Sequence, residues 1–449
     1  MIASYFLKNA QIVNENKALY KDVLIVNDII QSITDPKQFV NLPENCKEID
    51  LEGKLLLPGV IDDQVHFRDP GLTDKADIVT ESRAAVAGGT TSFMDMPNTI
   101  PNVLTQEILE DKYQMGAQKS LANFSFYMGT SNHNAAEVIK TNPKNVCGIK
   151  IFLGASTGNM LVDNMETLEE VFEKAPTLVA VHCEDEFIIQ DNLKQFKAQY
   201  GEDIPVEAHP LIRSHKACLK SSTFAVNLAK KHQTRLHVLH LSTADETALF
   251  TNEIPLEEKK ITAEVCVHHL WFSDKDYAKK GSLIRWNPAI KTQNDADKLL
   301  EALLDERLDV VATDHAPHQW ELKQHSYLKA PSGAPMVQHS LVSMLQMAQQ
   351  GKISIEKVVE KMCHNPARLF RVEKRGYIRV GYFADLVVVN PKKTWTVEKE
   401  NILYKCAWSP LEGQVFDHQI EKTFVNGHLA YDLGVFDDSK KGKRLTFDR

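Results

Sequence analysis

The sequence lacks the features that mark membrane, secreted and disulfide-stabilised proteins. No stretch approaches about 18 uninterrupted apolar residues, so no transmembrane helix is predicted. The seven cysteines are dispersed without a CxxC pair, which argues against a disulfide framework and for a reduced cytoplasm. The first residues show no basic region followed by a long apolar core, so we do not expect a secretory signal.

An excess of positive charge is also missing. Lysine and arginine together number 52, aspartate and glutamate 60, and the formal net charge is −8. A nucleic-acid partner or an acidic membrane surface is therefore not expected, because either would need a basic face. The 449 residues are 43% hydrophobic and 25% charged, which is ordinary for a globular protein with room for a large core and a second, smaller one.

The sequence does contain a regular alternation of β-rich apolar runs with amphipathic segments of helical length. This alternation is typical of parallel β/α units. The runs are Leu55–Asp62, Thr90–Met96, Phe124–Gly129, Cys147–Leu153, Leu178–His182, Leu236–Leu241, Ile261–Val267 and Leu308–Thr313, and helices are predicted at Ile78–Ala87, Met165–Lys174, His215–His232 and Asp295–Leu304. Eight units predict an α/β fold with a closed (β/α)8 barrel of the TIM type; an open eight-stranded sheet is the alternative.

Strand patterns also occur at both ends of the chain. Asn27-Asp28 separates two apolar runs near the start, and Asn426-Gly427 does so near the end; both are hairpin signatures. Further strands are predicted at 376–381 and 384–389. We therefore predict a small β-sandwich domain built from residues 1–55 and 375–449, around a barrel domain at 56–374.

Polar residues collect where the apolar runs end. They are Gln64, His66, Asn98, His182, His240, Asp314 and His318, and Lys150 lies inside the fourth run. Barrel enzymes build their active sites at the carboxyl ends of the strands, so these side chains are predicted to converge. A single histidine at a strand end is most often a structural residue, but several at the same end of successive strands indicate a shared site.

These residues stand in motifs that resemble those of the amidohydrolases, and among them the dihydroorotases. The motifs are PGVIDDQVHFRDPG at 58–71, MPNT at 96–99, GIKIF at 148–152, VHCE at 181–184, HLST at 240–243, TDHAPH at 313–318 and GYFADLVV at 381–388. Their order, spacing and placement agree over essentially the whole chain.

The resemblance implies a zinc site of one or two ions at the barrel mouth. His66 and Asp314 would bind one ion, His182 and His240 the other, and Lys150 would bridge them as an N-carboxylated lysine. A protonated lysine offers no acceptor, so it becomes a ligand only after such a modification. The alternative is that Lys150 simply pairs with a neighbouring carboxylate.

One ligand position departs from the family pattern. Gln64 stands where the family has its first histidine, and an amide oxygen is a weaker zinc ligand than an imidazole. We therefore expect the metal shared by His66, Lys150 and Asp314 to be held more weakly than the other. The implied chemistry is attack of a zinc-activated hydroxide on a ring amide, with Asp314 as the catalytic proton carrier.

The resemblance also implies a substrate-binding set. Arg68, Asn98 and His318 would hold the carboxylate of dihydroorotate, while Asn287, Ser332 and Gly333 would contact the ring. A guanidinium offers a forked pair of donors to a carboxylate, so Arg68 favours a ring that carries one. His268, His269 and His315 are expected to support the site without binding metal. The loop at 319–330 is either a lid or an ordinary surface loop.

The leading hypothesis is a dihydroorotase that interconverts dihydroorotate and N-carbamoyl-aspartate in pyrimidine biosynthesis. The alternatives are another cyclic amidohydrolase, of the allantoinase or hydantoinase type, and a catalytically silent relative that supports aspartate transcarbamoylase. Small-molecule substrates, a cytoplasmic location and a homodimer are expected with the first hypothesis.

Overall fold

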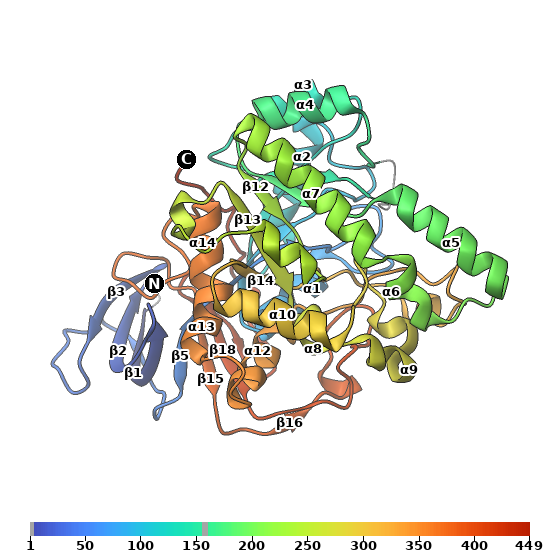
Figure 1. The fold of residues 1–449 in the computed structure, drawn as a ribbon. Coiled ribbons are helices and arrows are strands. Elements are labelled where there is room, and N and C mark those ends of the chain that lie inside the picture. Colours follow the sequence, from blue (N-terminus) through green and yellow to red (C-terminus); the bar gives the residue numbers. More distant parts are fainter. Residues whose placement is uncertain (1–3, 155–159) are drawn as a thin grey trace.

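Parallel strands in the centre of the molecule close into a barrel (Figure 1). The computed structural model describes residues 4–154 and 160–449. The barrel strands are β6 (Val60–Val65), β7 (Thr90–Asp95), β8 (Asn123–Phe126), β9 (Met128–Gly129), β10 (Ile149–Phe152), β11 (Val179–His182), β12 (Leu236–Val238), β13 (Ile261–Cys266) and β14 (Val310–Ala312). Neighbouring strands pair in chain order, and the third predicted run is divided into β8 and β9.

The ring is closed between its last and first strands. Val65 and His315 form a parallel bridge, and the backbone N–H of His66 donates to His315 O at 2.7 Å. The predicted closed barrel is therefore confirmed, and the open sheet is excluded. Its strands are buried on both faces, which explains why they read as continuous apolar runs.

Helices surround the barrel, and three of them have the predicted bounds: α1 (Ile78–Ala87), α4 (Met165–Lys174) and α7 (His215–His232). α10 (Gln293–Leu304) begins earlier than predicted, because Thr292 caps it and accepts from Asp295 N. The others are α2 (Gln106–Lys119), α3 (Ala135–Ile139), α5 (Glu186–Tyr200), α6 (His209–Ile212), α8 (Val267–Trp271), α9 (Tyr277–Lys280), α11 (Trp320–Lys323), α12 (Ser340–Gln349), α13 (Ile355–Val359) and α14 (Asn365–Phe370). None of the described helices is long and apolar enough to cross a membrane.

The two ends of the chain meet in one nine-stranded sheet, seen in Figure 1 where the blue strands approach the orange and red ones. Its strands are β1 (Ser4–Asn14), β2 (Lys17–Val26), β3 (Ile29–Thr34), β4 (Lys47–Asp50), β5 (Leu55–Pro58), β15 (Leu386–Asn390), β18 (Gln419–Val425), β19 (His428–Asp432) and β20 (Val435–Phe436). β5 and β15 pair antiparallel and so join the two ends. A separate ribbon pairs β16 (Trp395–Thr396) with β17 (Val415–Phe416).

Both predicted hairpins are present, and two other predictions need correction. β2 and β3 pair across Asn27-Asp28, and β18 and β19 pair across Asn426-Gly427. The segment 376–381 is a loop rather than a strand, since Gly376 and Gly381 adopt φ of 77° and 81°. The first predicted run is two strands, because β5 belongs to the terminal sheet and β6 to the barrel.

Candidate active site at the barrel mouth

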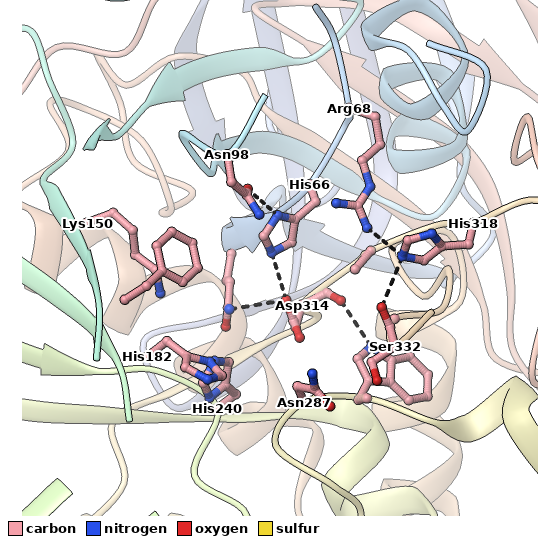
Figure 2. A pocket seen from close by; sticks show the side chains of 15 residues that line it. His66, Arg68, Asn98, Lys150, His182, His240, Asn287, Asp314, His318 and Ser332 are labelled. Carbon is pink, nitrogen blue, oxygen red and sulfur yellow. Dashed lines mark hydrogen bonds and ion pairs between the residues drawn. The ribbon is translucent and has the colours of Figure 1, made fainter. Parts of the chain in front are cut away.

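Every candidate site residue lines a single pocket at the carboxyl ends of the barrel strands (Figure 2). The lining comprises Gln64, His66, Arg68, Asn98, Lys150, His182, His240, Asn287, Asp314, His318, Ser332 and Gly333, together with Phe152, Trp286 and Ala316. The convergence predicted from the strand ends is thus present in the structure. Figure 2 separates Lys150, His182 and His240 on one side from Arg68, His318 and Ser332 on the other, with His66 and Asp314 between them.

The backbone turns sharply where several of these side chains leave the strands. Arg68, His240 and Asp314 have φ of 66°, 40° and 43°, in the left-handed region that residues other than glycine seldom adopt. Such conformations concentrate at functional sites, where the surrounding fold holds them in place.

His66 and Asp314 face each other as two acceptors. Nδ1 of His66 lies 2.8 Å from Asn98 Oδ1, so it carries the proton and donates to that amide oxygen. Nε2 then presents a lone pair to Asp314 Oδ1 at 3.1 Å. The amide nitrogen of Gln64 lies 3.2 Å from the same oxygen. A lone pair opposite a carboxylate is favourable only with a cation or proton between them, so this pair fits a metal ion.

The second pair of candidate ligands, His182 and His240, also places a ring-nitrogen lone pair in the pocket. His182 Nε2 lies 3.1 Å from Glu184 Oε2, and a carboxylate favours a proton on that nitrogen. His182 Nδ1 is then free to face His240 Nε2, which is 2.9 Å away. Glu184 also pairs with Arg213. Although burial alone would raise the pKa of Glu184, Arg213 and His182 lower it to about 2.

Lys150 lines the same pocket as both pairs, and its amine has no hydrogen-bond partner among the described residues. Its ammonium nitrogen is buried and makes no hydrogen bond with any described residue. It lies 4.6 Å from the centre of the Phe152 ring, and burial lowers the pKa of the amine to about 7. No ion pair within residues 4–154 and 160–449 includes it, which argues against the alternative of a simple carboxylate partner. A buried orphaned amine among acceptors fits a modified, metal-bridging lysine.

The opposite side of the pocket is rich in donors. Arg68 is only 4% exposed; its Nε lies 3.3 Å from Pro317 O and its NH2 lies 3.2 Å from His318 Nε2. His318 Nε2 is also 3.0 Å from Ser332 O. Burial lowers the pKa of Arg68 to about 10, so the guanidinium stays charged at neutral pH. Among the described residues no carboxylate forms an ion pair with it, which leaves its charge available to an anionic ligand.

A fully buried cluster of charged side chains contacts the backbone of the candidate ligand His240. His237 Nε2 lies 3.2 Å from Asp63 Oδ2 and 3.3 Å from Glu264 Oε2. Burial would lower the pKa of His237, but the two carboxylates raise it to about 9. The other oxygen of Glu264 accepts from the backbone N–H of His240 at 3.0 Å. The cluster is therefore internally compensated and fixes the backbone of a candidate ligand.

The three histidines expected to support the site make defined contacts in the structure. His269 Nε2 donates to Pro288 O at 3.2 Å, beside Asn287. His268 stacks on Trp286 with ring centres 3.9 Å apart. His315 Nε2 lies 2.8 Å from Glu81, and its Nδ1 accepts from the Met336 amide at 2.9 Å.

Three residues of the site had no role in the sequence analysis. Glu184 orients His182, Glu264 holds the His240 backbone, and Trp286 donates from Nε1 to Asp314 O at 3.2 Å. Glu184 stands two residues after a candidate ligand, so a search for acidic residues near each histidine would have found it. The contacts of Glu264 and Trp286 join distant segments and leave no local pattern.

Comparison with known proteins agrees with this geometry. The Amidohydrolase family model matches residues 55–430. The chain belongs to the amidohydrolase family. It is 32% identical to a protein named dihydroorotase from Methanosarcina acetivorans, covering 91% of this chain and 88% of that one. It is also 32% identical to one of the same name from Pyrococcus abyssi, covering 88% of each.

Solved structures confirm the fold class of this family member, a barrel with a smaller β domain. The L-hydantoinase (dihydropyrimidinase) from Arthrobacter aurescens superimposes with a TM-score of 0.92 at 26% identity, covering 99% of this chain and all of that one. The dihydropyrimidinase from Brevibacillus agri gives a TM-score of 0.87 at 24% identity over 99% of this chain, which is a likeness of fold alone.

Proposed function

We propose that this amidohydrolase is a zinc-dependent dihydroorotase. The observation that carries the proposal is Arg68, a buried guanidinium that forms no ion pair with a carboxylate among the described residues. It points into the pocket across from the candidate metal ligands. Burying an unpaired charge is costly, so its position is best explained by an anionic substrate. A ring that bears a carboxylate beside its amide meets this requirement, and dihydroorotate is such a ring.

The same observation disfavours the alternative of a hydantoinase-type enzyme acting on an uncharged ring. A neutral ring in this pocket would leave Arg68 and His318 without a negative partner. The curated relatives at 32% identity are named dihydroorotases, which supports the anionic substrate. The likeness to hydantoinase structures supports the fold and a shared chemistry on cyclic amides, and it does not identify the substrate.

The donor set fits the metal that the family implies. His66 and Asp314 would hold one zinc ion, His182 and His240 the other, with N-carboxylated Lys150 between them. When bound, zinc lowers the pKa of water to about 7 and polarises an amide carbonyl. Gln64 would contribute at most an amide oxygen to the first ion, so that ion is held more weakly.

The chain's own residues would then perform the following work. Arg68, Asn98 and His318 bind the carboxylate and fix the orientation of the ring. Asn287 and the backbone at Ser332 and Gly333 contact the ring amide. Asp314 accepts the proton of the attacking water and delivers it to the departing ring nitrogen, giving N-carbamoyl-aspartate. In the reverse direction the same groups close the ring.

The remaining expectations belong to this proposal. Residues 1–55 with 375–449 would form the small domain and 56–374 the catalytic domain. The reaction would serve pyrimidine biosynthesis in the cytoplasm, and the chain would form a homodimer. A catalytically silent subunit is disfavoured, because silent relatives usually lose several ligands and here only position 64 departs from the pattern.

The test combines metal analysis with a substrate panel. Purified protein supplied with zinc is assayed for bound zinc by elemental analysis, and for hydrolysis of dihydroorotate, hydantoin, dihydrouracil and allantoin. We expect bound zinc and a clear preference for dihydroorotate. Preference for an uncharged ring would transfer the proposal to the hydantoinase class. Zinc without turnover of any ring would favour the silent subunit, and the absence of both would refute the metalloenzyme.

A further inference from the structure

Two backbone segments that are far apart in the sequence close one side of the pocket. The segment 285–287 contributes Trp286 and Asn287, and the segment 331–333 contributes Ser332 and Gly333. They are joined directly where the Gly333 N–H donates to Arg285 O at 2.8 Å. The separation of these two segments therefore sets the width of the pocket at the ring-contacting side.

A buried lysine lies behind both segments. Lys323, the last residue of α11, is 2% exposed. Its ammonium nitrogen donates to Pro331 O and Gly333 O, each at 2.8 Å, and approaches Arg285 O at 3.5 Å. An ammonium has three donors and no acceptor, so a cradle of three carbonyls matches its bonding capacity.

Charge pairing does not explain this lysine. Among the described residues no carboxylate forms an ion pair with Lys323, and the charged side chains that influence its pKa, Arg285 and Arg68, are both cations. Burial and these cations lower the pKa of its amine well below the ordinary value. Burying such a group reduces stability unless its bonds are needed.

The loop between α11 and the pocket is anchored from the other segment as well. The Arg285 guanidinium stacks on the Tyr327 ring at 4.1 Å and donates to Ala330 O at 2.7 Å. His209 bridges the Tyr327 hydroxyl at 2.9 Å and Trp286 O at 2.7 Å. These contacts favour a fixed loop over a free lid at 319–330.

We propose that Lys323 is a positioning residue that holds segments 285–287 and 331–333 at the separation required to bind the substrate ring. The inference rests on the proposed function for the identity of the ring. The holding of the two segments by Lys323, called the clamp below, follows from the contacts of Lys323. Gly333 shows how little freedom the segment has: its φ is +117°, and an added Cβ would lie 2.5 Å from Ala316 O. A small shift of this backbone would misalign the ring-contacting groups.

The test compares Lys323→Met with Lys329→Met. Methionine keeps the length and apolar body of Lys323 but removes its donors, while Lys329 is an exposed lysine of the same loop. We expect Lys323→Met to raise KM for dihydroorotate about tenfold with kcat within about threefold, since contacts made equally in ground and transition state act on KM. Bound zinc should be unchanged, and Lys329→Met should behave as the wild type.

Hydrogen exchange provides a readout that does not depend on turnover. A peptide covering 331–335 should exchange about tenfold faster in Lys323→Met than in the wild type. The Gly333 amide donates to Arg285 O, and without Lys323 that carbonyl is no longer held in place. A peptide from β11 should not change. An inactive wild type would refute the proposed function. The exchange experiment would then still test whether Lys323 holds the segment 331–333. KM and exchange both within twofold of the wild type would overturn the clamp.

A second variant covers the case in which Lys323→Met does not fold. Lys323→Gln retains an amide donor on a slightly shorter side chain and should give an intermediate KM and intermediate exchange at 331–335. Values equal to those of the wild type would overturn the proposal.

Discussion

Lys150→Met should stabilise the metal-free protein while abolishing the proposed zinc site. The buried wild-type amine has no hydrogen-bond partner among residues 4–154 and 160–449, so removing it from water destabilises the fold. Methionine has nearly the same length and no polar atom to desolvate. The variant thus separates the effect of Lys150 on the stability of the fold from its contribution to metal binding.

The magnitude follows from the pKa of the amine. Burial lowers it from the ordinary 10.5 to about 7. Between these values the unfolded chain binds a proton that the folded chain does not, so wild-type stability rises as the pH rises through this window. At about 1.4 kcal/mol for each pKa unit, the variant should be more stable by roughly 4 kcal/mol at pH 7 and by roughly 1.5 kcal/mol at pH 9.5.

The assay is urea denaturation in chelator and CO2-free buffer at both pH values. Lys112→Met is the matched control, because Lys112 is equally buried but lies 2.7 Å from Asp95 Oδ2. Removing that partner leaves a buried carboxylate unpaired and should destabilise the protein by about 3 kcal/mol or more. A Lys150→Met protein that is less stable than the wild type at pH 7, or equally changed at both pH values, would refute the reasoning.

Three further substitutions test the two sides of the pocket. Gln64→His should tighten binding of the zinc ion proposed at His66 and Asp314, measured by competition with a chelator; unchanged affinity would mean that position 64 is not a ligand position. Glu184→Gln should weaken the other ion about 10–100-fold by releasing His182. Ionised Glu184 also contributes to the free energy of unfolding, fully above pH 4.5 and less as the pH falls toward its folded pKa of about 2. The variant should lose this pH-dependent contribution. Arg68→Met should raise KM for dihydroorotate about 100-fold and leave turnover of uncharged rings unchanged; an equal effect on both would contradict a carboxylate subsite.

The barrel and its mouth could be predicted because both leave a local pattern. Strands buried on both faces are continuous apolar runs, so seven of the eight runs correspond to barrel strands alone. Polar residues directly after such runs must lie at one end of a parallel barrel. His66, His182 and Asp314 therefore met in the structure as the order of the motifs implied.

The errors occurred where the decisive contact joins distant segments. Leu55–Asp62 reads as one strand, yet the chain passes from the terminal sheet to the barrel at Gly59, where a Cβ would lie 2.0 Å from Thr91 Oγ1. The apolar pattern continues through that point, so nothing local marks the change. Lys323 likewise looks like any lysine of a polar loop, since the carbonyls that bind it include one from position 285.

The distribution of lone pairs and donors in the pocket also fixes how a substrate must lie. The lone pair of His66 Nε2 faces the carboxylate of Asp314, and that pair requires positive charge on its side of the pocket. Arg68 requires negative charge on the other side. A ring with its carboxylate toward Arg68 and its amide toward His66, Asp314 and the proposed metal satisfies both requirements at once, whereas the reversed ring satisfies neither. In the proposed enzyme, selectivity for a ring with a carboxylate and the orientation of the scissile amide therefore have the same physical origin.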